Sequence, residues 1–138
     1  MTDDLINAEL PSTDDEWRVR LSPDEFRVLR RAATEPAWTG EYVNTKTRGT
    51  YHCRACGAKL FNSDAKFDSH CGWPSFDDAI AGTVKEIEDR SHGMARTEIR
   101  CARCDSHLGH VFHGERMTEK DTRHCVNSLS IRLEPRDQ

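Results

Sequence analysis

The sequence predicts a mainly β domain with antiparallel strands behind a short helical N-terminus, stapled by four cysteines at one zinc site. Signals for the start of a helix occur only near the N-terminus, at Thr13 and Ser22. From residue 50 onward, short β-like runs alternate with turn residues and no long helical period occurs, which is typical of antiparallel strands. Two Cys-x-x-Cys pairs lie in this second part, and this spacing is typical of a tetrahedral metal site.

Length and composition limit the classes of protein. A chain of 138 residues fits one domain. With 36% hydrophobic and 32% charged residues, a metal is a plausible supplement to the apolar core. The formal net charge of −4 provides no basic field for nucleic acid or an anionic membrane.

The N-terminal region predicts an acidic tail followed by two helices. Residues 1–15 are acidic and poor in large apolar groups, so we expect a mobile tail there and a single domain over 16–138. The runs 13–16 and 22–25 both fit the capping box, in which a hydroxyl and a Glu satisfy orphan backbone N–H groups. The second helix would place Phe26, Leu29 and Ala33 toward the core and end at Glu35-Pro36, because the residue before proline avoids the α region.

The chain shows no sign of export or of a membrane span. Its acidic start lacks the basic residues and apolar run of a secretory leader, and no stretch approaches the roughly 20 apolar residues that a span needs. We therefore expect no membrane contact and a cytoplasmic location, where thiols stay reduced. Six cysteines in that compartment indicate metal binding or redox catalysis before a disulfide framework.

Four runs are the candidate strands: Thr83–Ile87, Ala95–Arg100, Leu108–Phe112 and Cys125–Leu133. In the last run, alternation places residues 125, 127, 129, 131 and 133 on one face. Leucine and isoleucine occupy the later positions, so this face would point to the core. Cys125 and Asn127 would then lie side by side where the row reaches a pocket.

Four cysteines form two identical knuckles, Cys53-x-x-Cys56 and Cys101-x-x-Cys104, with 44 residues between them. Two such knuckles supply the four thiolates of a structural zinc site, which leaves no open position for substrate water. Iron also accepts four thiolates. A thioredoxin-like dithiol would be expected beside a βαβ pattern, which is not apparent here, and four unrelated buried thiols are the weaker alternative.

Cys71 and Cys125 remain. A free cysteine is usually a small buried hydrophobe, but the contexts of these two indicate more. Arg123 and His124 precede Cys125 and could lower the pKa of its thiol. Cys71 lies in a turn-rich segment next to Gly72 and Trp73. One activated thiol and one thiol in a loop suit a nucleophile and a resolving partner.

His107 and His110 add two imidazoles three residues apart. In a helix they would share a face, whereas in a strand they fall on opposite faces, so we expect only one to line the pocket. An isolated histidine is usually structural, but beside an activated thiol it becomes a candidate general acid.

Together these segments resemble the peptide methionine-(R)-sulfoxide reductases, the type B methionine sulfoxide reductase family in its zinc-containing form. The resemblance extends from about Trp17 to Leu133. It rests on several motifs in order, namely Thr39-Gly40-Glu41-Tyr42, both knuckles, Lys66-Phe67-Asp68-Ser69, Gly72-Trp73-Pro74-Ser75-Phe76, Ser91-His92-Gly93-Met94, Arg96-Thr97-Glu98, His107–Phe112 and Cys125-Val126-Asn127-Ser128.

The resemblance implies a fold of two antiparallel sheets with peripheral helices, and a role for each matching residue. Cys125 matches the nucleophile and Cys71 matches the resolving cysteine of many members. Trp73 matches the aromatic residue that packs on the S-methyl group of the substrate. The remaining matches are His107, His110 and Asn127 in the catalytic site, Phe112, His92 and Arg123 at the substrate, and Cys53, Cys56, Cys101 and Cys104 as zinc ligands.

The implied activity is thiol-dependent reduction of methionine R-sulfoxide in oxidised proteins, a repair of oxidative damage. It would pass through a Cys125 sulfenic acid and a Cys71–Cys125 disulfide recycled by thioredoxin. It also implies one structural zinc per chain, and we expect a monomeric protein. A zinc-ribbon-like binding module explains the knuckles but neither remaining cysteine, and a zinc hydrolase or deaminase needs an open metal position.

Three features depart from the family pattern. His70 stands where glycine is usual, and the loop 112–123 lacks the usual Asp-Gly-Pro and is one residue longer. His124 replaces an aromatic residue before the nucleophile. We expect its side chain to point to solvent, on the strand face opposite Cys125.

Overall fold

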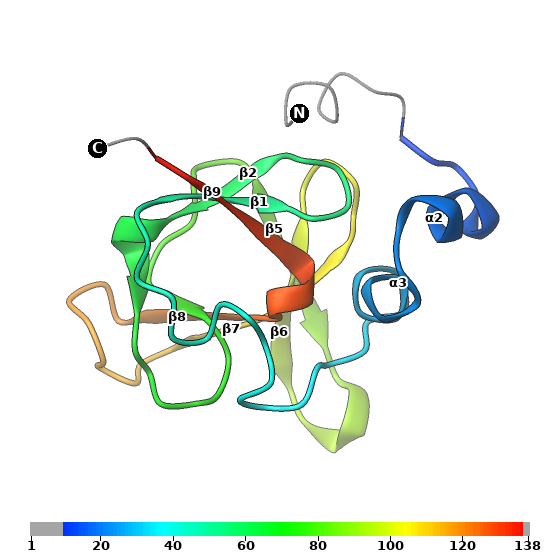
Figure 1. Cartoon of the computed structure of the whole chain (residues 1–138). Coiled ribbons are helices and arrows are strands. Elements are labelled where there is room, and N and C mark those ends of the chain that lie inside the picture. Colours follow the sequence, from blue (N-terminus) through cyan, green and yellow to red (C-terminus); the bar gives the residue numbers. More distant parts are fainter. Residues whose placement is uncertain (1–9, 137–138) are drawn as a thin grey trace.

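The computed structural model describes residues 10–136, except for the side chain of His92, as two antiparallel β-sheets with two helices beside them (Figure 1). The predicted mainly β fold is therefore confirmed. Most of the expected acidic tail lies outside the described residues, and its last two positions, Asp14 and Asp15, belong to the first helix. No helix in the described part of the chain is long and apolar enough to cross a bilayer.

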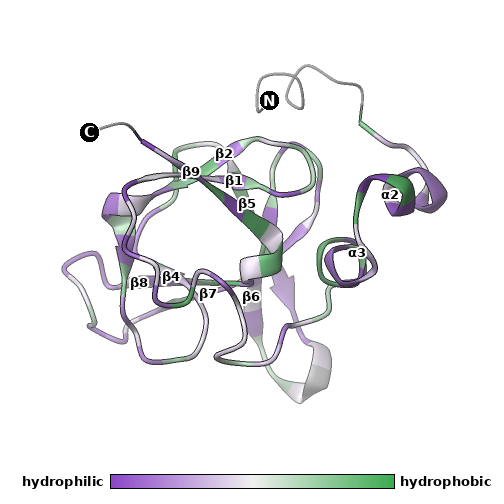
Figure 2. Cartoon of the chain, in the orientation of Figure 1, coloured by the Kyte–Doolittle hydropathy of each residue, from purple (hydrophilic) through white to green (hydrophobic). Residues whose placement is uncertain are grey.

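The two helices begin at the predicted capping boxes. Helix α2 spans Asp14–Arg20 and helix α3 spans Pro23–Arg31, each with a reciprocal capping box at its N-terminus. Each carries hydrophobic residues among hydrophilic ones (Figure 2), and Trp17, Phe26 and Leu29 are buried.

Helix α3 ends earlier than predicted. Ala32 adopts a left-handed conformation with φ of 57°, a common way for a helix to end, and the N–H of Ala33 donates to the Arg27 carbonyl at 3.1 Å. The expected stop at Glu35-Pro36 is thus wrong by four residues, and Ala33 lies outside the helix.

The smaller sheet has the order β2-β1-β9, with β1 at Gly49–Cys53, β2 at Lys59–Asn62 and β9 at Ile131–Pro135. The larger sheet has the order β3-β4-β8-β7-β6-β5. Its strands in chain order are β3 (Lys66–Phe67), β4 (Ser75–Phe76), β5 (Val84–Asp89), β6 (Arg96–Cys101), β7 (His107–His113) and β8 (Thr122–Val126). Short 3₁₀ turns lie at η1 (Ser63–Ala65), η2 (Ser91–Gly93) and η3 (Ser128–Ser130).

The predicted C-terminal strand Cys125–Leu133 is in fact two strands in different sheets. Strand β8 ends at Val126, the turn η3 carries the chain across, and β9 begins in the smaller sheet. The predicted single face from Cys125 to Leu133 is therefore wrong. The side chains that point to the core are His124 and Val126 in β8 but Ile131 and Leu133 in β9, so the alternation changes phase across the break.

Aromatic side chains fill the space between the sheets. Phe61 of β2 stacks on Phe76 of β4 with ring centroids 4.4 Å apart, and Tyr51 of β1 meets Phe76 edge-on at 5.1 Å. His124 of β8 joins this cluster, edge-on to Phe61 at 5.7 Å, and is only 8% exposed. The expectation that His124 points to solvent is wrong, although it does lie on the face of β8 opposite Cys125. Its Nδ1–H donates to the Phe76 carbonyl at 3.1 Å.

Candidate functional site

A cavity of about 200 Å³ opens on the outer face of the larger sheet. It is smaller than the roughly 300 Å³ at which drug-sized ligand pockets begin, so it suits a single side chain. Its walls come from β6, β7 and β8, the residue after β8, and the loops before β4 and after α3. The lining residues are Thr34, Cys71, Trp73, Arg96, Gly109, His110, Phe112, Arg123, Cys125, Val126 and Asn127.

This cavity brings together seven of the nine pocket residues that the sequence singled out. The exceptions are His107, which lies behind the cavity, and His92, whose side chain is outside the described part of the chain. Thr34, Arg96, Gly109 and Val126 also line it. The last three lie in motifs that carry the family resemblance, whereas no sequence signal pointed to Thr34.

Cys71 and Cys125 face each other across the cavity with their sulfurs 3.9 Å apart. A disulfide needs about 2.05 Å between the sulfurs, so a shift of about 2 Å would join them. Cys125 lies on β8, hydrogen-bonded between β4 and β7. Cys71 lies in a loop between His70 and Gly72, both with left-handed backbone, φ of 60° and 93°. The sheet thus holds the sulfur of Cys125, whereas hydrogen bonds with Ser69, Ser75 and the Trp73 carbonyl hold the sulfur of Cys71.

The contact between the two sulfurs shifts the pKa values of the two thiols in opposite directions. The hydrogen bond from Cys125, together with those from Ser69 and Ser75, lowers the pKa of Cys71 to about 4. The same sulfur contact and burial raise the pKa of Cys125. Arg123 lowers the pKa of Cys125 as predicted, but the neighbouring Cys71 outweighs it. The two thiols therefore titrate as one pair across this contact.

His110 lies beside Cys125 as its direct cross-strand partner. Its Nε2 is 2.8 Å from an Asp89 carboxylate oxygen, and a carboxylate accepts only, so Nε2 carries the proton. Asp89 is also held by the backbone N–H of Ser91 at 2.9 Å. The ring orientation of His110 is therefore fixed from the far side of the pocket. No sequence signal pointed to Asp89, because the contact joins β5 to β7 across β6.

His107 and His110 lie on the same side of β7, contrary to the expectation of opposite faces. Ile99 pairs with Gly109 and Arg100 with His107, so Leu108 is an extra residue and forms a β-bulge. One extra residue reverses the alternation, and the two rings meet edge-on with centroids 5.7 Å apart.

His107 is 4% exposed, and its Nδ1 bonds Glu98 at 2.7 Å. Burial lowers the pKa of His107. It supports the His110 ring from behind and does not reach the cavity.

The remaining pocket residues are held by specific contacts. The Trp73 indole N–H donates to the Glu35 carbonyl at 2.9 Å. The Asn127 amide donates to the Leu108 carbonyl at 3.1 Å. Arg123 forms a bidentate pair with Glu115, at 2.7 and 3.1 Å, and lies 4.5 Å over the Phe112 ring.

The departures at His70 and in the loop 112–123 are accommodated without displacing the pocket residues. His70 takes its left-handed conformation without glycine; its N–H donates to Asp68 at 3.0 Å. The altered loop supplies Glu115, which anchors Arg123.

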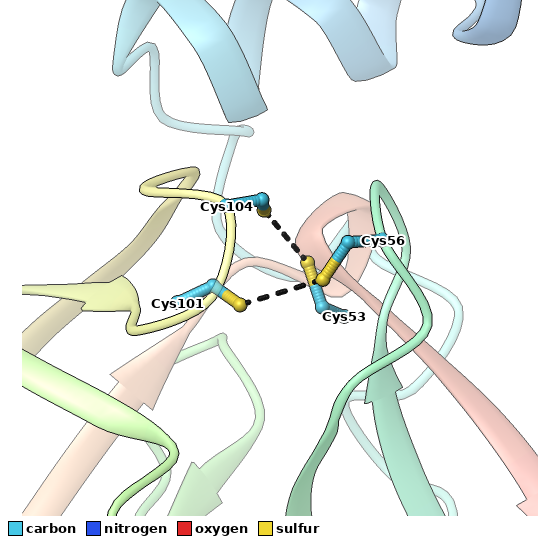
Figure 3. Close-up of side chains that lie close together, drawn as sticks. All are labelled: Cys53, Cys56, Cys101 and Cys104. Carbon is cyan, nitrogen blue, oxygen red and sulfur yellow. Dashed lines mark hydrogen bonds between the residues drawn. The ribbon is translucent and has the colours of Figure 1, made fainter. Parts of the chain in front are cut away.

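The four knuckle cysteines meet at one point between the two sheets (Figure 3). Cys53 ends β1 and Cys101 ends β6, so each sheet contributes one knuckle. Both knuckles turn alike: the Gly57 N–H donates to the Cys53 carbonyl and the Asp105 N–H to the Cys101 carbonyl, each at 2.8 Å.

The sulfur geometry fits a tetrahedral metal. Cys53 and Cys104 sulfurs are 3.7 Å apart and those of Cys56 and Cys101 are 3.6 Å apart. Ligands at about 2.3 Å from a tetrahedral zinc lie about 3.8 Å from one another. All four side chains are buried, and all four ligand atoms lie within 4.8 Å of one another. The quartet could therefore hold one metal ion, with no position left for a substrate.

Comparisons with known proteins agree with this geometry. The SelR domain matches residues 21–135. "Peptide methionine sulfoxide reductase MsrB" of Acinetobacter baumannii (strain ATCC 17978) is 56% identical over 133 residues, covering 95% of this chain and 94% of that protein. Proteins of the same name match from Acinetobacter baylyi, 54% identical with 91% of each chain covered, and from Thiobacillus denitrificans, 50% identical with 96% and 100% covered.

Among solved structures, the Mis18 "Yippee-like" domain matches 66% of this chain and 99% of its own, with a TM-score of 0.54 and 17% identity. At that identity the likeness concerns the fold alone.

Proposed function

We propose, from the premise that this chain belongs to the SelR-domain family of MsrB-type peptide methionine sulfoxide reductases, that Cys125 and Cys71 carry its reaction. The chain is a peptide-methionine (R)-S-oxide reductase. The observation that carries our assignment is the pair of sulfurs 3.9 Å apart in a cavity that His110 also lines.

In the first half-reaction, Cys125 attacks the sulfoxide sulfur. His110, protonated on both ring nitrogens and held at Nε2 by Asp89, donates its Nδ1–H to the sulfoxide oxygen. A sulfoxide sulfur is a poor electrophile until its oxygen is protonated or hydrogen-bonded, so both groups must act together. The oxygen passes from the substrate sulfur to Cys125: one thiol and one sulfoxide give one sulfenic acid and one methionine. The cross-strand pairing of His110 with Cys125 supports this assignment, and Asp89 is its positioning residue.

Attack also requires that Cys125 lose its proton. Its hydrogen-bond partner is the Cys71 sulfur, 3.9 Å away, which can take up that proton. A proton transfer from Cys125 to Cys71 leaves the charge on the sulfur that is fixed in the sheet. The pair then behaves as one titrating unit.

Substrate selection follows from a chiral pocket. Trp73 would pack on the S-methyl group, with Phe112, Arg123 and Asn127 completing the walls. When the pocket holds the methyl group of the substrate on one side and its sulfoxide oxygen on the other, only one epimer presents its sulfur to Cys125. His92 stays a substrate-binding prediction, and His107 supports His110 instead of touching the substrate.

In the second half-reaction, Cys71 resolves the sulfenic acid. Its thiol condenses with the Cys125 sulfenic acid to give a Cys71–Cys125 disulfide and one water. A dithiol protein of low potential such as thioredoxin restores both thiols by exchange and takes up the disulfide. The loop position of Cys71 supports this order, because a loop adjusts to close the bond more readily than strand β8, which is paired on both sides.

We further propose zinc as the metal of the four-cysteine site, because four thiolates in tetrahedral array are its usual structural site. Zinc would neutralise the thiolates and join the two sheets. Mutual sulfur contacts raise the pKa of Cys53 and Cys101 and lower that of Cys56 and Cys104. A divalent cation would displace the protons that remain.

The setting of the enzyme is also part of the proposal. We place it in the cytoplasm as a monomer whose residues 16–138 form one catalytic domain, acting on oxidised proteins and on neither nucleic acid nor membrane. A zinc-ribbon-like module without activity is the alternative, and it leaves the sulfur pair and its cavity unexplained.

The test is a thioredoxin-coupled assay with the R and S epimers of a methionine sulfoxide peptide. Cys125→Ser is expected to abolish reduction of the R epimer, and retained activity would overturn the nucleophile assignment. Cys71→Ser is expected to give about one methionine per chain and then stop. Sustained turnover of Cys71→Ser with thioredoxin would show that another group resolves the sulfenic acid.

A further inference from the structure

Glu35 has a carboxylate buried behind the pocket, on the segment that follows α3. The residue is 3% exposed. Its two oxygens accept backbone N–H groups at 2.9 Å each, from Ser128 and from Leu129. A buried carboxylate is costly unless it is fully hydrogen-bonded, and its bonds to N–H groups are the strong, charge-assisted kind. Glu35 thus clamps the turn η3, which begins directly after Asn127.

The backbone of the same residue holds two pocket side chains. The Glu35 N–H donates to the Asn127 amide oxygen at 3.0 Å, and the Glu35 carbonyl accepts the Trp73 indole N–H at 2.9 Å. The preceding residue, Thr34, lines the cavity itself. One residue therefore connects the Trp73 ring, the Asn127 amide and the turn after β8.

The following loop covers this carboxylate closely. A Cβ added to Gly40 would lie 2.3 Å from the Glu35 Oε2 and 2.2 Å from the Ser128 hydroxyl oxygen. The Tyr42 N–H donates to that hydroxyl at 3.1 Å. Only glycine at position 40 allows the chain to approach so closely, and the result is a carboxylate shielded from water.

The reacting groups are held by other means. Cys125 and His110 lie in the ladder between β8 and β7, and Asp89 fixes the His110 ring. None of these contacts passes through Glu35. Loss of the Glu35 carboxylate would therefore loosen the substrate-contacting groups while leaving the nucleophile and the proton donor in place.

We propose that Glu35 is a positioning residue for substrate recognition, acting through Trp73 and Asn127 on the orientation of the sulfoxide. This rests on the proposed function. Its carboxylate fixes segment 34–36 against turn 127–129, so that the ring and the amide stay at a set separation on either side of the substrate. Because the two epimers differ only in which way methyl and oxygen point, this separation governs the choice between them.

The test compares Glu35→Gln with Glu41→Gln, a matched loss of one carboxylate from the same segment. The Glu41 carboxylate is 59% exposed and pairs with Arg54 at 2.8 Å, away from the pocket. We expect Glu35→Gln to lower kcat/KM for the R epimer about tenfold or more, mainly by raising KM, since one oxygen becomes an N–H donor facing another donor. We also expect the ratio of kcat/KM for the R epimer to kcat/KM for the S epimer to decrease. Glu41→Gln is expected to match the wild type.

The reactivity of the Cys125 thiol distinguishes a positioning role of Glu35 from a general role in keeping the protein folded. Alkylation of Cys125 by iodoacetamide, located by mass spectrometry, is expected to proceed in Glu35→Gln within about twofold of the wild-type rate and with the same pH profile, since the sheet holds the thiol. A parallel loss of alkylation and turnover would overturn the proposal, as would an unchanged KM and R/S ratio.

Glu35→Asp keeps the charge on a shorter side chain, so it is expected to restore part of the epimer preference. If Glu35→Gln does not fold, the proposal is tested by the ratio of kcat/KM for the R and S epimers in Glu35→Asp. A ratio equal to that of the wild type refutes the proposal. Wild-type protein that reduces neither epimer would instead refute the proposed function.

Discussion

Substitution of Gly109 by alanine tests whether the position of Cys125 depends on close contact between β7 and β8. Gly109 pairs with Val126 across this ladder. A Cβ at Gly109 would lie 1.9 Å from the carbonyl oxygen of Cys125, 2.9 Å from its carbonyl carbon and 3.1 Å from the Cα of Val126. All three contacts are with backbone, so no side chain can rotate to relieve them.

The size of the effect follows from the contact distance. Real Cβ atoms essentially never approach closer than 3.0 Å, so β8 must move by about 1 Å at the nucleophile. A misplacement of this size costs about 100-fold in rate. Forcing one methyl into a packed site costs about 1–3 kcal/mol of stability, which lowers Tm by roughly 3–10 °C for a domain of this size.

The assay is kcat/KM for the R epimer, measured well below the Tm of the variant. Gly82→Ala is the control, because Gly82 has φ of +80° and nothing within 4 Å of an added Cβ. It should lose about 1–2 kcal/mol of stability through the backbone alone and keep its activity. If Gly109→Ala, fully folded, retains kcat/KM within about threefold of wild type, the rigid-ladder reasoning is wrong.

Three further predictions concern the metal and pH. Chelation of the metal, or Cys104→Ser, should remove one zinc per chain, as measured by metal analysis. Structural zinc contributes about 10 kcal/mol to the folding of small domains, so the free energy of unfolding, measured in urea, should fall by a large part of that amount. Burial lowers the pKa of His124. As pH falls below about 6.5, the unfolded chain therefore takes up a proton at this histidine before the folded chain does, and the free energy of unfolding decreases. His124→Phe should make this free energy, measured in urea, depend less on pH between about 7.5 and 5.5. The hydrogen bond from His110 lowers the pKa of Asp89, so its contribution is present above about pH 4 and lost as pH falls further. Asp89→Asn should therefore reduce the loss of stability between about pH 6 and 3, and should lower kcat because His110 loses its fixed orientation.

Local signals in the sequence predicted the features that depend on neighbouring residues. Both capping boxes form as expected, since each involves residues only three positions apart. The two knuckles also carry their own turn geometry, so their cysteines could be grouped without knowing the fold.

The errors occur where a contact distant in sequence overrides a local period. The strand predicted from Cys125 onward breaks at Ser128–Ser130, because Glu35, far away in the chain, binds two N–H groups there. The bulge at Leu108 depends on register with β6, which periodicity within β7 does not contain. The family resemblance supplied pocket residues that neither period nor spacing could place.

The burial of the metal quartet has a consequence for the fidelity of disulfide formation. A sulfenic acid at Cys125 condenses with whichever thiol reaches it first, and six cysteines in one chain allow many wrong pairings. Four of the six lie in the core with 0–7% exposure, with their sulfurs turned toward one another. Cys71 is the one other partly exposed cysteine among residues 10–136. The fold thereby directs each oxidation toward a single, reversible cross-link that a reductant can reach.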